Sequence, residues 1–321
     1  MTLKSVDLEG LQPLHIANPY LDDPQTLNRM WKEDGYLFFR DVIDKDAIAD
    51  LQKTYLDALI DLGVIDTGST EPLWNGANLD GFPFKIEQIE KSKIWQRFVE
   101  HPSVRELAAR VFQDEPCFLP MTEYRVTPPA PKTEGDALLF RHQDAYLNAG
   151  IPFRVFWIPV SDIDAEAGGL VIAEGWNKRG FVHDPDDYPK YAIAAETIPD
   201  NAWRRSDYHP GDVLVFDVMT PHSGAWNASN TFRCSMDLRV MKASDTRPII
   251  GAIANVGPDS ISIRDDGGAV TRLSVAETSM IRGANRMPVT SRAAMSAELP
   301  AGTRVLVGHA KGVITCVRPE R

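Results

Sequence analysis

The sequence lacks the features of several large protein classes. No run of 18 apolar residues occurs in its 321 residues, so we expect no transmembrane helix. The first residues have no apolar core of the kind that signal peptides carry. Basic residues number 34 against 45 acidic ones, and a net charge of −11 does not suit electrostatic binding to nucleic acid or anionic membranes. We expect a small-molecule partner and no nucleic-acid or membrane partner.

Cysteine is also scarce. The three cysteines, Cys117, Cys234 and Cys316, are odd in number and far apart. They fit neither a disulfide framework nor a cysteine-based zinc site. This usage is typical of a reduced protein and predicts a cytoplasmic location.

The first third of the chain has the period of helices. Apolar residues recur at three- and four-residue steps over residues 24–34, 46–62 and 102–112, which predicts three amphipathic helices. The aromatic and β-branched run 36–43 predicts a short strand. Residues 64–84 are rich in Gly, Pro and Asn and predict a loop.

From about residue 117 the period changes to two. Short alternating segments bounded by turn residues predict an antiparallel sandwich or barrel. The predicted strands cover residues 117–126, 137–146, 153–160, 169–175, 212–219 and 231–240. A second β-rich block begins near residue 249, with Gly-containing hairpins at 260–275 and 304–317. We expect this block to form a small separate barrel.

One short motif combines metal-binding residue types. His142 and Asp144 are two residues apart, and side chains at this spacing in a strand point to the same face. His222 is the best third ligand, since it follows the strand-like run 212–219 and precedes SGAWN, which predicts a tight turn. Two histidines and one carboxylate suit Fe(II) and leave coordination positions open.

The segment 231–240 separates apolar from polar side chains. Its polar row contains Arg233, Ser235, Asp237 and Arg239. If this row faces the metal cavity, Arg233 is a fixed fork for a carboxylate and Ser235 a hydroxyl donor, as a dicarboxylate co-substrate requires. Arg239 either binds a ligand or forms an ion pair with an acid such as Asp237.

Three motifs together resemble one enzyme family. HQD at 142–144, PHSG at 221–224 and FRCS at 232–235 resemble the phytanoyl-CoA dioxygenase family of Fe(II)/2-oxoglutarate-dependent oxygenases, and the spacing from His222 to Arg233 matches. The likeness covers about residues 30–245.

The resemblance implies a double-stranded β-helix (jelly roll) with flanking helices in residues 1–248. It does not extend to residues 249–321, where the hairpin pattern predicts a small β-barrel-like domain, so the whole chain is expected to be mainly β. It implies that His142, Asp144 and His222 hold Fe(II), and that Arg233 and Ser235 bind 2-oxoglutarate beside Met121. O₂ is the second co-substrate, and hydroxylation of a C–H bond is the default outcome. Since Asp144 occupies the position where related halogenases carry Gly or Ala, halogenation is disfavoured.

The substrate is less defined than the reaction. The aromatic loops 70–86 and 174–205 predict lids over an apolar or cyclic secondary metabolite, and the acidic catalytic part disfavours a CoA ester. The expected pocket residues are Trp74, Phe84, Trp176, Trp226 and Arg239. His183 is expected to be a solvated loop histidine.

Two other functions fit the same residues. One is a non-catalytic member of the fold that only binds a ligand, and the other is a metal-dependent enzyme of the cupin type that does not use 2-oxoglutarate. Residues 250–321 carry a net charge of +3 with no chemical signature, so we expect a packing or homo-oligomerisation module there.

Overall fold

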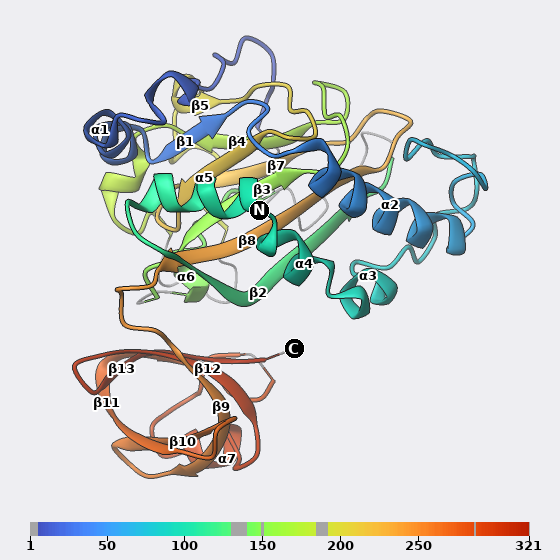
Figure 1. The fold of residues 1–321 in the computed structure, drawn as a ribbon. Coiled ribbons are helices and arrows are strands. Elements are labelled where there is room, and N and C mark those ends of the chain that lie inside the picture. Colours follow the sequence, from blue (N-terminus) through green and yellow to red (C-terminus); the bar gives the residue numbers. More distant parts are fainter. Residues whose placement is uncertain (1–5, 130–139, 149–150, 184–191, 286, 321) are drawn as a thin grey trace. The chain divides into compact units, whose positions relative to one another are not determined.

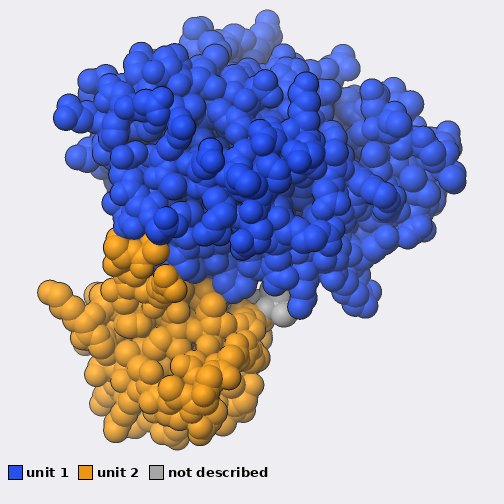
Figure 2. Space-filling view, viewed as in Figure 1, with its two compact units in different colours: residues 1–143, 153–242 blue, residues 144–152, 243–321 orange. Residues whose placement is uncertain are grey.

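The computed structural model contains two compact units. One comprises residues 1–143 and 153–242, and the other comprises residues 144–152 and 243–321 (Figure 2). The structure describes residues 6–129, 140–148, 151–183, 192–285 and 287–320.

The first unit is a double-stranded β-helix built from two antiparallel sheets (Figure 1). The larger sheet has the strand order β1 (Tyr36–Phe39), β6 (Val213–Asp217), β3 (Arg154–Pro159), β8 (Arg233–Lys242), β2 (Pro116–Thr127). The smaller sheet has the order β5 (Trp203–Arg204), β4 (Gly169–Ala173), β7 (His222–Ala225). The fold class expected from the sequence is therefore confirmed.

Helices cover the outer face of the larger sheet (Figure 1). They are α1 (Pro24–Asp34), α2 (Lys45–Asp61), α3 (Glu87–Ser92), α4 (Ile94–Glu100) and α5 (Pro102–Phe112). Their apolar faces pack on the apolar row of β8, which includes Cys234, Met236 and Leu238. Burying one face in this way requires the other face of β8 to line the space between the two sheets.

Most predicted elements of this unit are confirmed, and their ends follow from local chemistry. Helix α1 begins where the Asp23 side chain accepts hydrogen bonds from the backbone N–H of Gln25 and Thr26, and it ends at Gly35, whose φ is +82°. Short 3-10 turns add η1 (Asn18–Tyr20), η3 (Trp176–Arg179) and η4 (Asp200–Ala202). None of the described helices combines the length and hydropathy needed to span a membrane.

Two local predictions near the metal motif were wrong. Residues 140–144 form no strand; they make one isolated bridge, His142 to His222, and the helix α6 (Ala145–Asn148) follows. The remainder of the predicted strand, 137–139, lies outside the described residues. The segment after His222 is not a turn but the strand β7, because residues 222–225 pair with β4 from Ile172 to Gly169.

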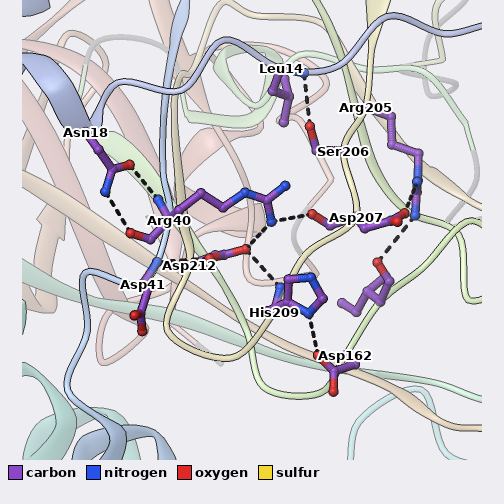
Figure 3. A network of polar contacts seen from close by, with 11 residues as sticks. Leu14, Asn18, Arg40, Asp41, Asp162, Arg205, Ser206, Asp207, His209 and Asp212 are labelled. Carbon is purple, nitrogen blue, oxygen red and sulfur yellow. Dashed lines mark hydrogen bonds and ion pairs between the residues drawn. The ribbon is translucent and has the colours of Figure 1, made fainter.

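A polar network locks the end of β1 to the beginning of β6 (Figure 3). The buried carboxylate of Asp212 accepts from Arg40 Nη1 at 2.7 Å and from the backbone N–H of Asp41 and His209. His209 also contacts Asp162 at 2.6 Å. Phe39 pairs with Val213 beside this network, and Tyr36 pairs with Phe216 at the opposite end of the two strands. The network therefore joins β1 and β6 at the end remote from Phe216.

The second unit contains a small closed barrel. Its strand order is β10 (Ser260–Asp265), β11 (Val270–Ile281), β13 (Val313–Pro319), β12 (Arg304–Ala310), β9 (Ile249–Val256), with the short helix α7 (Met295–Glu298) beside it. Both predicted hairpins are present, as β10–β11 and β12–β13. Ile261, Ile263, Val305 and Val307 fill its core. Closure leaves no strand edge unpaired, which suits a barrel this small.

Candidate metal centre

His142, Asp144 and His222 converge at one point. One possible ligand atom from each lies within 4.8 Å of the other two. The two histidines meet because their backbones form a mutual pair: each N–H donates to the carbonyl of the other at 2.9 Å. Their rings are 4.2 Å apart between centroids. Asp144 is buried and precedes α6, and its carbonyl accepts the helical N–H of Asn148.

Hydrogen bonds to the backbone set the orientation of both imidazoles. His142 Nδ1 lies 3.1 Å from the carbonyl of Phe140, and His222 Nδ1 lies 3.0 Å from the carbonyl of Thr220. Because a carbonyl only accepts, each Nδ1 carries the proton and each Nε2 carries the lone pair. Two neutral imidazoles and a carboxylate are the donor set that fits Fe(II), and the fixed tautomers are those that metal-binding histidines require.

The motif's central residue, Gln143, is part of this arrangement, and sequence reasoning missed it. Gln143 is fully buried, and its side chain bonds to the backbone of Gly180, Val182 and Met219. Its backbone N–H donates to His183 Nε2 at 3.1 Å. The prediction that His183 is solvated was wrong: His183 is 7% exposed, because it packs behind the metal motif. The signal available in the sequence was the position of Gln143, an amide side chain between two predicted metal ligands.

Arg233 reaches from the larger sheet to the smaller one. Its Nη1 donates to the carbonyls of Ala225 at 2.6 Å and Ala167 at 3.1 Å, and its Nη2 donates to Thr127 Oγ1 at 3.1 Å. A guanidinium has five N–H donors, so Nε–H and one Nη2–H have no acceptor among the described residues. Nε and Nη2 form one edge of the guanidinium, and such an edge matches the two oxygens of a carboxylate. Burial lowers the pKa of Arg233 to about 10, so the group remains a cation at neutral pH.

Gly168 brings the backbone close enough for this contact. Its φ is +84°, and a Cβ there would overlap the main-chain oxygen of Trp226 and lie 2.8 Å from that of Ala225. Only glycine therefore lets the turn before β4 approach the end of β7. Ala225 is three residues beyond His222, so about 10 Å of strand separates the Arg233 contact from the histidine.

The remaining polar row of β8 is buried between the sheets. Ser235, Asp237 and Arg239 are each at most 5% exposed. Asp237 accepts from Arg125 Nε at 2.8 Å and forms an ion pair with Arg239 Nη1 at 3.4 Å. The polar row thus faces the interior of the unit and not solvent. Arg239 takes the ion-pair role that was one of its two expected roles.

The other expected site residues lie in different places. Met121 is buried in β2, at the register shift between Leu119 and Glu123 opposite β8. Trp74 packs against the outer core cluster, on the face of β8 that carries Cys234. Phe84 is 63% exposed and lines a small surface cavity that Arg125 also lines.

Two tryptophans flank the smaller sheet. Trp176 packs against the cluster formed by Val171 and Ala173, which alternate along β4 with Ile172, the partner of His222. It therefore lies on the side away from the metal motif. Trp226 directly follows β7 and is partly buried. Pocket roles for Trp74, Phe84, Trp176, Trp226 and Arg239 stay predictions. Tyr188 and Tyr191 of the expected lid lie outside the described residues.

Two further groups among the described residues offer three possible ligand atoms. In the first, formed by His15, Asp34 and Glu174, Arg204 already donates to Glu174 at 3.0 Å. In the second, Asp44 and Asp46 are exposed beside His101. Neither combines burial with fixed imidazole tautomers, so the cluster around His222 is the strongest candidate.

The chain is similar to several known proteins. The family model for phytanoyl-CoA dioxygenase matches residues 31–235. Proteins named 1-deoxypentalenic acid 11-beta-hydroxylase from Streptomyces arenae and Streptomyces exfoliatus are 29% and 28% identical, each over 72% of this chain and 86% of the relative. A solved structure of the epimerase SnoN with Fe3+, alpha ketoglutarate and nogalamycin RO is 21% identical, with a TM-score of 0.49 over 69% of this chain and 86% of that one.

The matched range contains the three converging residues and Arg233. It covers more than half of the chain and excludes the barrel of β9–β13. The chain belongs to the phytanoyl-CoA dioxygenase family and is an Fe(II)/2-oxoglutarate-dependent dioxygenase.

Proposed function

We propose that His142 and His222, through Nε2, and Asp144, through its carboxylate, hold the Fe(II) ion. One observation carries this proposal: both Nδ1 atoms are bound to backbone carbonyls, while a ligand atom of each residue lies within 4.8 Å of the others. Three ligands of this kind would leave coordination positions of the ion open for co-substrate and O₂.

The far carboxylate of 2-oxoglutarate binds the Nε–Nη2 edge of Arg233, with Ser235 two residues along the same face of β8. Met121, the third expected co-substrate residue, lies farther along β2, in the register shift opposite Asp237 and Arg239. Support comes from the hydrogen bonds of Arg233 to Ala167, Ala225 and Thr127, which hold the guanidinium in one plane. A pre-oriented fork binds a carboxylate with little further loss of side-chain entropy. With its far end held, the co-substrate is oriented before the substrate arrives.

When bound, iron, 2-oxoglutarate and O₂ supply the oxidation of an unactivated C–H bond, with succinate and CO₂ as co-products. The protein positions these groups and excludes water. Rings of Phe140 and Phe216 lie 5.0 and 4.6 Å from those of His142 and His222 and make the surroundings of the imidazoles apolar. Farther along β8, the ion pair between Asp237 and Arg239 places opposite charges next to each other inside the unit.

The substrate is a small secondary metabolite, apolar or cyclic, and the outcome is hydroxylation. The two relatives named as 1-deoxypentalenic acid hydroxylases support this outcome. The net charge of −14 over residues 1–249 argues against a CoA ester, whose phosphates favour a basic surface.

Substrate-independent succinate formation tests the assignment. Under anaerobic conditions, Fe(II) and 2-oxoglutarate together should give a visible charge-transfer band, and under air a slow release of succinate. Asp144→Ala and His222→Ala should abolish both, because each loses a ligand. Matched controls are Asp162→Ala and His209→Ala, which alter the network of Figure 3 and should keep the band.

The same measurements separate the other two functions. A non-catalytic ligand-binding protein gives the band but no succinate. A cupin-type enzyme without 2-oxoglutarate binds the metal and gives neither. Either result in the wild-type protein would exclude the dioxygenase mechanism assigned to these residues.

For the second unit we propose homo-oligomerisation through the barrel of β9–β13. Its exposed Val270 and Val313 support this, being 51% and 38% exposed on a barrel with no cluster of catalytic residue types among those described. Light scattering of the full chain should then give a mass above 35.7 kDa, and Val270→Asp with Val313→Asp should lower it. A mass of one chain at high concentration excludes the proposal.

Three free cysteines support a cytoplasmic location.

A further inference from the structure

The segment that carries two proposed iron ligands has almost no secondary structure to hold it. Residues 140–144 make a single bridge, from His142 to His222. A residue within a sheet is held by ladder bonds on both sides, and Asp144 has none because a turn and α6 follow at once. The positions of the two side chains must therefore depend on other contacts.

Gln143 supplies most of these contacts. Its Nε2 donates to the carbonyls of Met219 at 2.7 Å and Gly180 at 2.9 Å, and its Oε1 accepts the N–H of Val182 at 3.0 Å. Both donors and the acceptor of this buried amide are satisfied. All three partners are backbone groups, and none of them belongs to a proposed metal ligand.

His183 holds the backbone at the same position. Its Nε2 lies 3.1 Å from the backbone N of Gln143 and accepts that N–H. The bond fixes the peptide plane between His142 and Gln143, where the chain has no strand neighbour on that side. His183 is buried, so water does not compete freely for this donor.

Gln143 also connects the two ligand-bearing segments. Met219, whose carbonyl it binds, precedes Thr220, and the carbonyl of Thr220 orients the imidazole of His222. One buried amide thus ties the His142–Asp144 segment to the chain that leads into His222. Movement of either segment strains this set of bonds.

We propose that Gln143 and His183 are positioning residues for the metal centre, which together hold the carboxylate of Asp144 and Nε2 of His142 and His222 at the separation that a divalent ion requires. The inference rests on the proposed iron ligands. Loss of groups that orient metal ligands typically weakens metal binding about 10- to 100-fold, so we expect an effect of that size.

Binding of Mn(II), a redox-stable probe, to the full chain tests the proposal by electron paramagnetic resonance, with no turnover needed. Gln143→Leu removes the three side-chain bonds, and His183→Leu removes the acceptor for the Gln143 N–H. Each should weaken Mn(II) binding about 10- to 100-fold. His183→Gln places an amide oxygen near the position of Nε2 and should restore most of the affinity.

A matched control separates positioning from general loss of stability. Gln52 on α2 is a partly buried glutamine whose Nε2 donates to the carbonyl of Val160 at 3.1 Å, away from the metal motif. Gln52→Leu should lower the melting temperature and leave Mn(II) affinity unchanged. If Gln143→Leu does not fold, the pair His183→Leu and His183→Gln decides.

Three results overturn the inference in different ways. If folded His183→Leu binds Mn(II) as tightly as the wild type, with the same spectrum, while His142→Ala abolishes binding, then only the positioning role is wrong. If His142→Ala itself keeps wild-type affinity, the proposed metal ligands are wrong and the inference falls with them. Weakened binding in His183→Leu that His183→Gln does not restore also refutes the hydrogen-bond mechanism.

Discussion

Replacing Arg233 by lysine should weaken 2-oxoglutarate binding and spare the metal. The guanidinium has two donors on one edge for a carboxylate, after its three bonds to Ala167, Ala225 and Thr127. Lysine keeps the charge but replaces the fork by a point charge that makes one such bond at best. The change therefore costs one charge-assisted hydrogen bond.

The magnitude follows from that count. A hydrogen bond to a charged group contributes about 1.5–3 kcal/mol. A loss of about 2 kcal/mol corresponds to about 30-fold in a dissociation constant, since each 1.36 kcal/mol is about tenfold. The main-chain carbonyls of Ala167 and Ala225 also lose their donor, so the free energy of unfolding should fall by about 1–3 kcal/mol.

Two titrations measure the effect. The charge-transfer band of the anaerobic Fe(II) protein, titrated with 2-oxoglutarate, gives its dissociation constant, and Mn(II) binding without co-substrate gives the metal affinity. Arg233→Lys should raise the first about 30-fold and change the second less than about twofold. Circular dichroism confirms that the variant is folded at the assay temperature.

Arg154→Lys is the matched control. Arg154 is a partly buried arginine that donates to the carbonyl of Val111 at 3.1 Å and stacks on Trp31 at 3.9 Å on the helical side of the larger sheet. It should lose stability and keep 2-oxoglutarate affinity. If folded Arg233→Lys binds 2-oxoglutarate as the wild type does, Arg233 is not the anchor, and the carboxylate must bind elsewhere.

Three further predictions concern stability and reactivity. Burial raises the pKa of the Asp217 carboxyl above the usual 3.8. The protonated carboxyl therefore contributes favourably to folding stability below that pH, and this contribution is lost as the carboxyl ionises at higher pH. Asp217→Asn should therefore melt higher than the wild type at pH 7 and equally at pH 3; an equal melting temperature at both pH values contradicts this. Burial raises the pKa of the Cys234 thiol to about 12 and also raises that of Cys316, so a thiol reagent at pH 8 should label Cys117 quickly and the other two only after unfolding; three fast thiols would refute this. Ile263→Ala in the fully buried barrel core should cost about 2–5 kcal/mol in urea unfolding, whereas Ile16→Ala, at 48% exposure, should cost far less; similar losses would argue against the barrel core.

Much of the fold could be predicted because its signals are local. Helices 24–34 and 102–112 matched α1 and α5, since apolar spacing and capping act within a few residues. The short helices α3 and α4 were missed, because six or seven residues contain too few turns for a period to show.

For the candidate site, too, local features could be predicted from the sequence, whereas contacts between distant segments could not. By itself the sequence determined which residues have metal-binding chemistry and, through strict alternation in 231–240, that Arg233, Ser235, Asp237 and Arg239 share a face. Only the tertiary structure decided that His142 pairs with His222, that Gln143 and His183 hold the motif without a strand, and that Arg233 bonds across to β7. The physical reason is that alternation sets which way a side chain points within its own strand, whereas its partners depend on register between segments far apart in the chain.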